Sequence, residues 1–167
     1  MNDSLVIMGV SGCGKSSLAA AVAEAEGLPL VEGDAHHSEA SREKMRAGVA
    51  LTDADRAGWL ERLAAELCAH PQGCVLACSA LRRSYRDVLR SASPGLRFAF
   101  LDIAPEEAQA RVAARSAHFF SPRLVDNQFA TLESPLGEPR VRRLDATAPL
   151  SRLQTEVSTW LHTEEPA

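Results

Sequence analysis

The sequence lacks the features that would direct a chain to a membrane or to a nucleic acid. No apolar run approaches the roughly 18 residues that a membrane-spanning helix needs. The N-terminal residues, Met1 to Ser4, carry no basic segment, so they are not expected to form a signal peptide. The formal net charge of −4 leaves no basic surplus to neutralise a phosphate backbone. We therefore expect neither a membrane nor a nucleic acid as a partner.

The chain also has few cysteines, and no two of them have C-x-x-C spacing. The four are Cys13, Cys68, Cys74 and Cys78. This pattern favours reduced thiols in a cytoplasmic protein over a disulfide framework or a zinc site. A chain of 167 residues is long enough to bury a core without disulfides or a structural metal. We expect one domain over residues 1–167.

A phosphate-binding loop stands close to the N-terminus. Residues 9–16 read G-x-x-x-x-G-K-S, after a short apolar segment, 5–8, and before a helical pattern, 15–26. Glycines let successive backbone N–H groups point at phosphate oxygens, Lys15 reaches the β- and γ-phosphates, and Ser16 offers its hydroxyl to Mg²⁺. The candidate residues for binding ATP are Gly9, Ser11, Gly12, Cys13, Gly14, Lys15, Ser16 and Ser17.

Strand-like and helix-like segments alternate along the chain, which is typical of a parallel sheet wrapped by helices. The expected strands cover 5–8, 30–31, 74–78, 97–101 and 141–144. The expected helices cover 15–26 and 84–91, and three more begin near Thr52, Pro105 and Pro149. The stretch 35–51 is rich in charge and small residues, and the stretch of about 116–140 reads as irregular. The prediction is an α/β P-loop NTPase fold with a five-stranded parallel sheet and with its site at the carboxyl ends of the strands.

Asp34 follows the second expected strand directly after Gly33. A carboxylate there could accept a hydroxyl proton or hold a metal-bound water, and the alternative is a turn aspartate that satisfies nearby N–H groups. The adjacent His36 and His37 are not expected to form a metal pair, because neighbouring residues rarely ligate one ion together.

Several arginines are candidates to neutralise phosphate charge. They are Arg82, Arg83, Arg86, Arg111, Arg115 and Arg123. Arg82 and Arg83 follow the third expected strand, and Arg111 and Arg115 share one face of a helix. The alternative is that these side chains only solvate helix surfaces. The aromatic run that begins at His118 could latch a lid over the site or form an ordinary small cluster.

Five stretches together give the chain a resemblance to a known family. They are Met8–Ser16, Glu32–His37, Leu51–Arg56 with Trp59-Leu60, Ala77–Asp87, and His118–Phe120 with Asn127–Glu133. The Cys-Ser-Ala-Leu block, the Tyr-Arg-Asp that follows it, and the His-Phe and Gln-Phe pairs are its most specific parts. On these residues the chain resembles the gluconate kinases, small P-loop sugar-acid kinases related to shikimate and adenylate kinases.

The resemblance implies ATP- and Mg²⁺-dependent phosphorylation of D-gluconate at its 6-hydroxyl. It implies catalytic roles for Lys15, Asp34, Arg82 and Arg115, and stacking of Arg111 on adenine. It implies gluconate contacts from Asp34, Arg56, Arg86, His118 and Gln128. It also implies an acceptor-binding region over about 34–58, a mobile lid over about 112–140 as in nucleoside-monophosphate kinases, and a homodimer.

The chain departs from the family pattern at three places: Ala117 precedes the His-Phe pair, Ala130 replaces an acid, and Arg82-Arg83 replace two lysines. The last change keeps the charge but alters the geometry of the contact. Two alternatives remain at this point. One is a P-loop kinase for another small acceptor, such as shikimate or a nucleoside monophosphate. The other is a nucleotide-binding switch that transfers no phosphoryl group.

Overall fold

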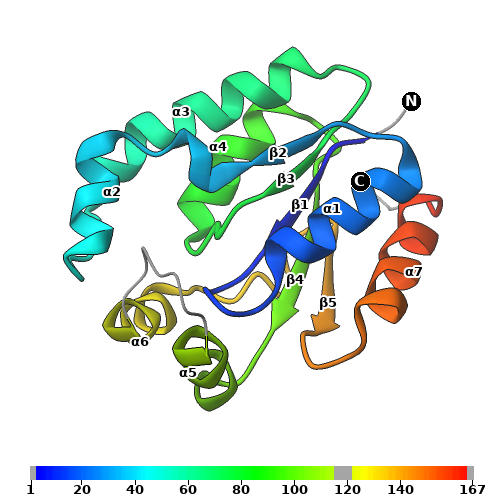
Figure 1. Cartoon of the computed structure of the whole chain (residues 1–167). Coiled ribbons are helices and arrows are strands. Elements are labelled where there is room, and N and C mark those ends of the chain that lie inside the picture. Colours follow the sequence, from blue (N-terminus) through cyan, green and yellow to red (C-terminus); the bar gives the residue numbers. More distant parts are fainter. Residues whose placement is uncertain (1–2, 115–121, 165–167) are drawn as a thin grey trace.

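A computed structural model of the chain describes residues 3–114 and 122–164 (Figure 1). Its centre is a five-stranded sheet in the order β2-β3-β1-β4-β5, and every neighbouring pair is parallel. The strands are β1 (Leu5–Met8), β2 (Leu30–Glu32), β3 (Val75–Ala77), β4 (Arg97–Asp102) and β5 (Val141–Asp145). The predicted α/β fold and its five parallel strands are confirmed.

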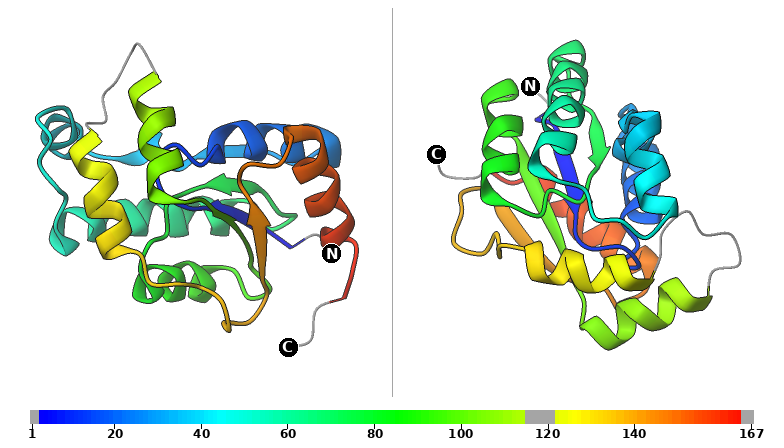
Figure 2. Two further views of the ribbon diagram at one scale, coloured as in Figure 1. Left: turned by 90° about the horizontal axis from the view of Figure 1, so that it is seen from below. Right: turned by 90° about the vertical axis from the view of Figure 1, so that its left-hand side faces the viewer.

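Helices cover both faces of the sheet, as the right-hand view of Figure 2 shows. The helices are α1 (Lys15–Glu26), α2 (Glu39–Arg46), α3 (Asp53–Ala69), α4 (Arg83–Ala92), α5 (Pro105–Ala114), α6 (Pro122–Thr131) and α7 (Leu150–Leu161). Side chains of β1 alternate between two cores. Leu5 and Ile7 pack in the core that includes α1 and α7, and Val6 and Met8 pack in the core that includes α3 and α4.

Local sequence signals set several helix ends where they were expected. Gly27 adopts the left-handed conformation (φ 65°) and ends α1. Thr52 begins α3 with a capping box, because its side chain accepts from the Asp55 N–H while the Asp55 carboxylate accepts from the Thr52 N–H. Pro149 is the N-cap of α7. None of the described helices is long and apolar enough to cross a membrane.

Two stretches in which no helix was predicted contain helices. Residues 33–36 form a short 3₁₀ helix, and α2 follows after the N-cap Ser38, whose side chain accepts from the Ser41 N–H. This helix buries only two residues, so its sequence has almost no apolar periodicity. The other is α6, which packs against the preceding helix α5 and accepts a hydrogen bond from Ser11, more than a hundred residues away, through Gln128. Helix α6 has only ten residues and lies beside several prolines, so its apolar pattern was too short to predict a helix.

A buried ion pair joins α4 to the segment that follows α6. Arg86 is fully buried, and its Nη2 lies 2.6 Å from Oε2 of Glu138, a side chain that is only 5% exposed. The same guanidinium donates to the carbonyl oxygens of Ala80 (2.7 Å) and Glu133 (3.0 Å). Arg90 adds a bond of 2.8 Å to Glu138. The prediction that Arg86 contacts gluconate is therefore wrong, because its donors are directed to these internal partners.

This network also stabilises an uncommon backbone conformation. Ala80, directly after β3, has φ 47°, in the left-handed region that residues with a Cβ seldom adopt. Its carbonyl accepts one of the Arg86 bonds. Burial raises the pKa of Glu138, but the hydrogen bonds from Arg86 and Arg90 lower it by more, so the carboxylate stays charged.

Glu138→Ala should lower the free energy of unfolding by about 3–5 kcal/mol, because it leaves the Arg86 charge buried without a counter-ion. Urea denaturation of both proteins measures the difference. Glu156→Ala is the matched control: it breaks the exposed pair with Arg142 and should cost only about 0–1 kcal/mol. Equal costs for the two variants would contradict the assigned importance of the buried pair.

Candidate active site

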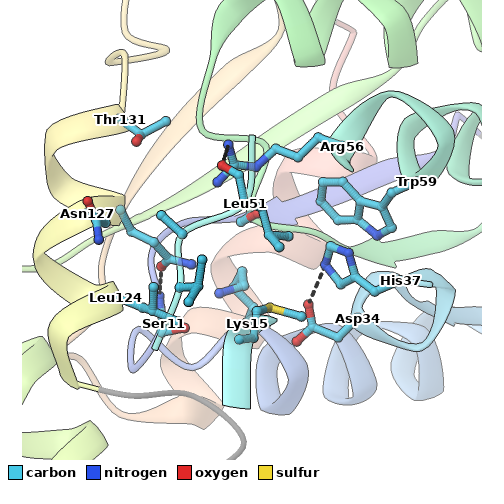
Figure 3. A pocket seen from close by; sticks show the side chains of 15 residues that line it. Ser11, Lys15, Asp34, His37, Leu51, Arg56, Trp59, Leu124, Asn127 and Thr131 are labelled. Carbon is cyan, nitrogen blue, oxygen red and sulfur yellow. Dashed lines mark hydrogen bonds and ion pairs between the residues drawn. The ribbon is translucent and has the colours of Figure 1, made fainter. Parts of the chain in front are cut away.

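One pocket opens at the carboxyl ends of the central strands, between the phosphate loop, the β2–α3 segment and α6 (Figure 3). Its lining brings together residues that are far apart in the sequence. They are Ser11, Lys15, Asp34, His37, Met45, Val49, Ala50, Leu51, Arg56, Trp59, Ser79, Leu124, Asn127, Gln128 and Thr131. Four of the predicted site residues therefore share one pocket with Ser11 of the loop: Lys15, Asp34, Arg56 and Gln128.

The phosphate loop connects β1 to α1, so that the first turn of α1 faces the pocket mouth. Gly12 has φ 85°, and a Cβ placed there would lie 2.8 Å from the Ala108 carbonyl oxygen. Only glycine fits this position. The loop is curved so tightly that Lys15 Nζ donates to the Val10 carbonyl oxygen at 3.1 Å. The N-terminus of α1 adds the positive end of its helix dipole, which favours a bound phosphate.

Ser16 and Glu32 provide oxygen atoms at the edge of this loop. Ser16 Oγ donates to Glu32 Oε2 at 3.0 Å, across the gap between α1 and the end of β2. Hydroxyl and carboxylate oxygens are the ligands that Mg²⁺ prefers. The predicted metal residue Ser16 therefore lies beside a carboxylate. The sequence reasoning missed Glu32, although it stands two residues before Asp34.

Helix α6 contributes a second contact to the loop. The Ser11 N–H donates to Gln128 Oε1 at 2.6 Å, one of the contacts drawn in Figure 3. This N–H belongs to the loop that is predicted to bind phosphate, and Gln128 was predicted to contact the acceptor. The bond places α6 where the expected phosphate-binding and acceptor-binding parts of the pocket meet. Asn127 and Thr131 also line the pocket and were not singled out from the sequence.

At the end of the pocket near β2, an aromatic stack of His37 and Trp59 lies beside Asp34. Trp59 donates through Nε1 to the Gly33 carbonyl oxygen at 2.7 Å. The His37 ring lies flat on Trp59, with ring centroids 4.4 Å apart and planes 13° apart. His37 Nε2 lies 3.9 Å from Asp34 Oδ1 (Figure 3). The Asp34 side chain is 58% exposed, so its carboxylate is open to a ligand.

The electrostatics of His37 follow from its position. Burial lowers its pKa to about 4; Asp34 raises the pKa, while Arg56, Arg42 and Arg62 lower it further. The imidazole is therefore neutral at pH 7. Asp34 and Arg56, which both act electrostatically on this ring, therefore lie near an uncharged group.

Arg56 is held at the opposite side of the pocket by backbone and aromatic contacts. Its Nη1 donates to the Leu51 carbonyl oxygen at 3.0 Å and to Tyr85 Oη at 3.3 Å. The Tyr85 hydroxyl in turn donates to Asp53, and this bond lowers the pKa of the Asp53 carboxyl. Tyr85 and Asp53 therefore position Arg56, and sequence reasoning assigned neither of them this role.

The remaining predicted residues lie in different places. Arg111 donates to the carbonyl oxygens of Gly12 (3.2 Å) and Ala146 (3.0 Å), so it packs against the phosphate loop. Ser17 is exposed on the first turn of α1. Arg82 is exposed at the N-cap of α4 and is not one of the described residues that line the pocket. Arg115 and His118 lie outside the residues that the structure describes.

Comparisons with known proteins agree with this geometry. The family model described as an AAA domain matches residues 5–139. A gluconokinase of Gluconobacter oxydans is 43% identical over 143 residues, which cover 84% of this chain and 80% of that protein. The thermoresistant gluconokinase of Escherichia coli is 38% identical over 87% of this chain and 85% of its own. The crystal structure of a gluconokinase from Sinorhizobium meliloti superimposes with a TM-score of 0.88, at 43% identity, over 96% of this chain and 91% of that one.

The lowered pKa of His37 predicts how folding stability depends on pH. The unfolded imidazole titrates near 6.5 and the folded one near 4, so the unfolded state binds more protons between these values. Stability should fall as the pH drops from about 6.5 to 4, by on the order of 2–3 kcal/mol. His37→Phe keeps an aromatic ring on Trp59 but has no titrating group.

Urea denaturation at pH 7 and pH 4.5 checks this for the natural chain and for His37→Phe. The variant should lose clearly less stability between the two pH values, because the other titrating groups are unchanged. An equal loss in both proteins would mean that His37 protonates as readily in the folded state as in the unfolded state.

Proposed function

The chain belongs to the gluconokinase family, and from this premise we propose that it transfers the γ-phosphoryl group of ATP to the 6-hydroxyl of D-gluconate. The observation that carries the proposal is one pocket lined by both Lys15 of the phosphate loop and the pair Asp34 and Arg56. Lys15 binds a triphosphate, and Asp34 and Arg56 suit an acceptor with a hydroxyl at one end and a carboxylate at the other. In-line transfer requires both substrates in one cavity.

At the nucleotide end, the N–H groups of the phosphate loop and the dipole of α1 hold the phosphates, and Lys15 offsets the charge that develops on the γ-phosphoryl group. Arg111, which donates to the Gly12 carbonyl oxygen, is proposed to stack on adenine. Arg82 and Arg115 are proposed as further sources of positive charge. When bound, Mg²⁺ would neutralise the β- and γ-phosphates, and Ser16 with Glu32 would hold it.

At the acceptor end, Asp34 takes the proton of the 6-hydroxyl while the hydroxyl oxygen attacks the γ-phosphorus. Arg56 binds the gluconate carboxylate, because Tyr85 and Leu51 fix its guanidinium at the side of the pocket away from Asp34 (Figure 3). Gln128 contacts the acceptor once phosphate has replaced it on the Ser11 N–H. His118 keeps its proposed gluconate contact through the family resemblance alone.

The wider organisation is also a proposal. The acceptor-binding region is about 34–58, and the lid is about 112–140. Residues 112–114 and 122–140 of that range are described, and Gln128 of α6 accepts a hydrogen bond from the Ser11 N–H of the phosphate loop. A homodimer follows from the family resemblance. Free thiols at Cys13, Cys68, Cys74 and Cys78 support a cytoplasmic location, since cytoplasmic thiols stay reduced.

A coupled ADP-release assay with Mg-ATP tests the function. The protein is assayed with D-gluconate, with shikimate, with AMP and with no acceptor. ADP release should depend on gluconate, and the product should be 6-phosphogluconate. Release with shikimate or AMP alone would assign a different acceptor, and release without any acceptor would identify an NTPase that transfers only to water.

Asp34→Asn should lower kcat by at least ~10², because the amide cannot accept the hydroxyl proton. Nucleotide affinity should stay within about twofold, since Asp34 is not part of the phosphate loop. Titration with the non-hydrolysable analogue AMP-PNP measures that affinity. Glu39→Gln, an exposed acid on α2, is the control and should leave both values unchanged. Normal turnover by Asp34→Asn would remove the proposed role of the carboxylate.

A further inference from the structure

His37 is a buried side chain whose polar atoms have no hydrogen bond within the described structure. Its Nδ1 is buried and has no hydrogen-bond partner there. Its Nε2 lies 3.9 Å from Asp34 Oδ1, which is beyond hydrogen-bond distance. The side chain is only 6% exposed, and yet it lines the pocket. A polar group in this state needs an explanation, because buried polar groups are normally paired.

Packing alone does not account for a histidine at this position. The ring lies flat on Trp59, and a phenylalanine would make the same stack without burying the unpaired Nδ1. Trp59 is itself fixed through its bond to the Gly33 carbonyl oxygen, one residue before Asp34. The stack therefore holds the imidazole in a set orientation relative to the carboxylate. Such fixed geometry is typical of a residue that recognises a ligand.

The protonation state of the ring determines what it can recognise. The charged groups that act on it are Asp34, Arg56, Arg42 and Arg62, and burial with the three arginines keeps it neutral. A neutral imidazole carries one N–H donor and one acceptor. The negative charge of Asp34 favours the proton on Nε2, the nitrogen nearest to it. Nε2–H and Asp34 Oδ1 then form a donor and an acceptor side by side.

We propose that His37 is an acceptor-binding residue, whose Nε2–H donates to the oxygen of the same hydroxyl that donates its proton to Asp34. This inference rests on the proposed function and adds to it a residue that recognises the reacting hydroxyl through a hydrogen bond. A hydroxyl oxygen about 2.8 Å from each atom fits between groups that are 3.9 Å apart.

The transfer step then balances with these two side chains. The 6-oxygen forms a bond to the γ-phosphorus, the bond between that phosphorus and the bridging oxygen of ADP breaks, and the hydroxyl proton passes to Asp34. His37 keeps its own proton throughout. Its hydrogen bond occupies one lone pair of the attacking oxygen and so directs another at the γ-phosphorus.

Three substitutions at His37 separate recognition from packing. His37→Phe keeps the stack and has no donor. His37→Gln places an amide nitrogen near the position of Nε2, and His37→Asn places one near Nδ1 instead. We expect His37→Phe to lower kcat/KM for D-gluconate by about 10- to 100-fold. His37→Gln should recover at least about tenfold of that loss, and His37→Asn should recover none.

Two further measurements test whether the His37 variants act through a general structural change and whether His37 acts as the base. The affinity for AMP-PNP should stay within about twofold in all three variants. The acidic limb of kcat/KM against pH should not move in His37→Gln, because His37 does not titrate near neutral pH. His162→Gln, at the exposed C-cap of α7 and outside the lining of the pocket, is the control and should behave as the natural chain.

Two outcomes would overturn the inference. One is a kcat/KM for His37→Phe within about threefold of the natural value. The other is equal recovery by His37→Gln and His37→Asn, which would show that the position of the donor does not matter. If the natural chain does not phosphorylate gluconate at all, the proposed function fails instead, and the acceptor panel reveals this before any variant is made.

Discussion

The pairing of β1 with both β3 and β4 is the constraint on which the rest of the structure depends. This short strand is buried on both faces, with Leu5 and Ile7 in one core and Val6 and Met8 in the other. Its central place in the sheet brings the phosphate loop to the same edge as the ends of β2 and β3. Asp34 and Lys15 can line one pocket only because these strands run parallel and end together.

The Arg86–Glu138 pair connects the sheet to the part of the site that α6 forms. Arg86 binds the carbonyl oxygens of Ala80 and Glu133, and the Glu133 N–H donates to the Leu81 carbonyl oxygen. The turn after β3 and the segment after α6 are therefore joined by a backbone hydrogen bond and by charge-assisted bonds from the buried Arg86. Buried pairs contribute little net stability relative to apolar packing, but they penalise any other arrangement strongly. Here that penalty favours the one arrangement in which α6 contacts the phosphate loop.

The sequence predicted the parts of the molecule whose causes are local. The G-x-x-x-x-G-K-S loop, the capping box of Thr52 and Asp55, and the ending of α1 at Gly27 each depend on residues within a few positions. Helix α6 and the burial of Arg86 depend on partners about fifty residues away or more, so no local pattern indicated them. The stack of His37 on Trp59 joins residues 22 positions apart (59 − 37) through tertiary packing. The sequence showed which residue types were present but not which of them would be enclosed.

The neutrality of His37 has a physical consequence for how two anions share one pocket. Lys15 and Arg56 are cations, and each suits one anionic group: a phosphate at the loop and a carboxylate at the far side. A third cation beside Asp34 would attract either anion and would pair with the carboxylate that we propose as the proton acceptor. Burial and three nearby arginines hold the pKa of His37 near 4 and prevent this. The ring can then donate a hydrogen bond to an uncharged hydroxyl without competing for phosphate, so recognition of the acceptor is separated from recognition of ATP.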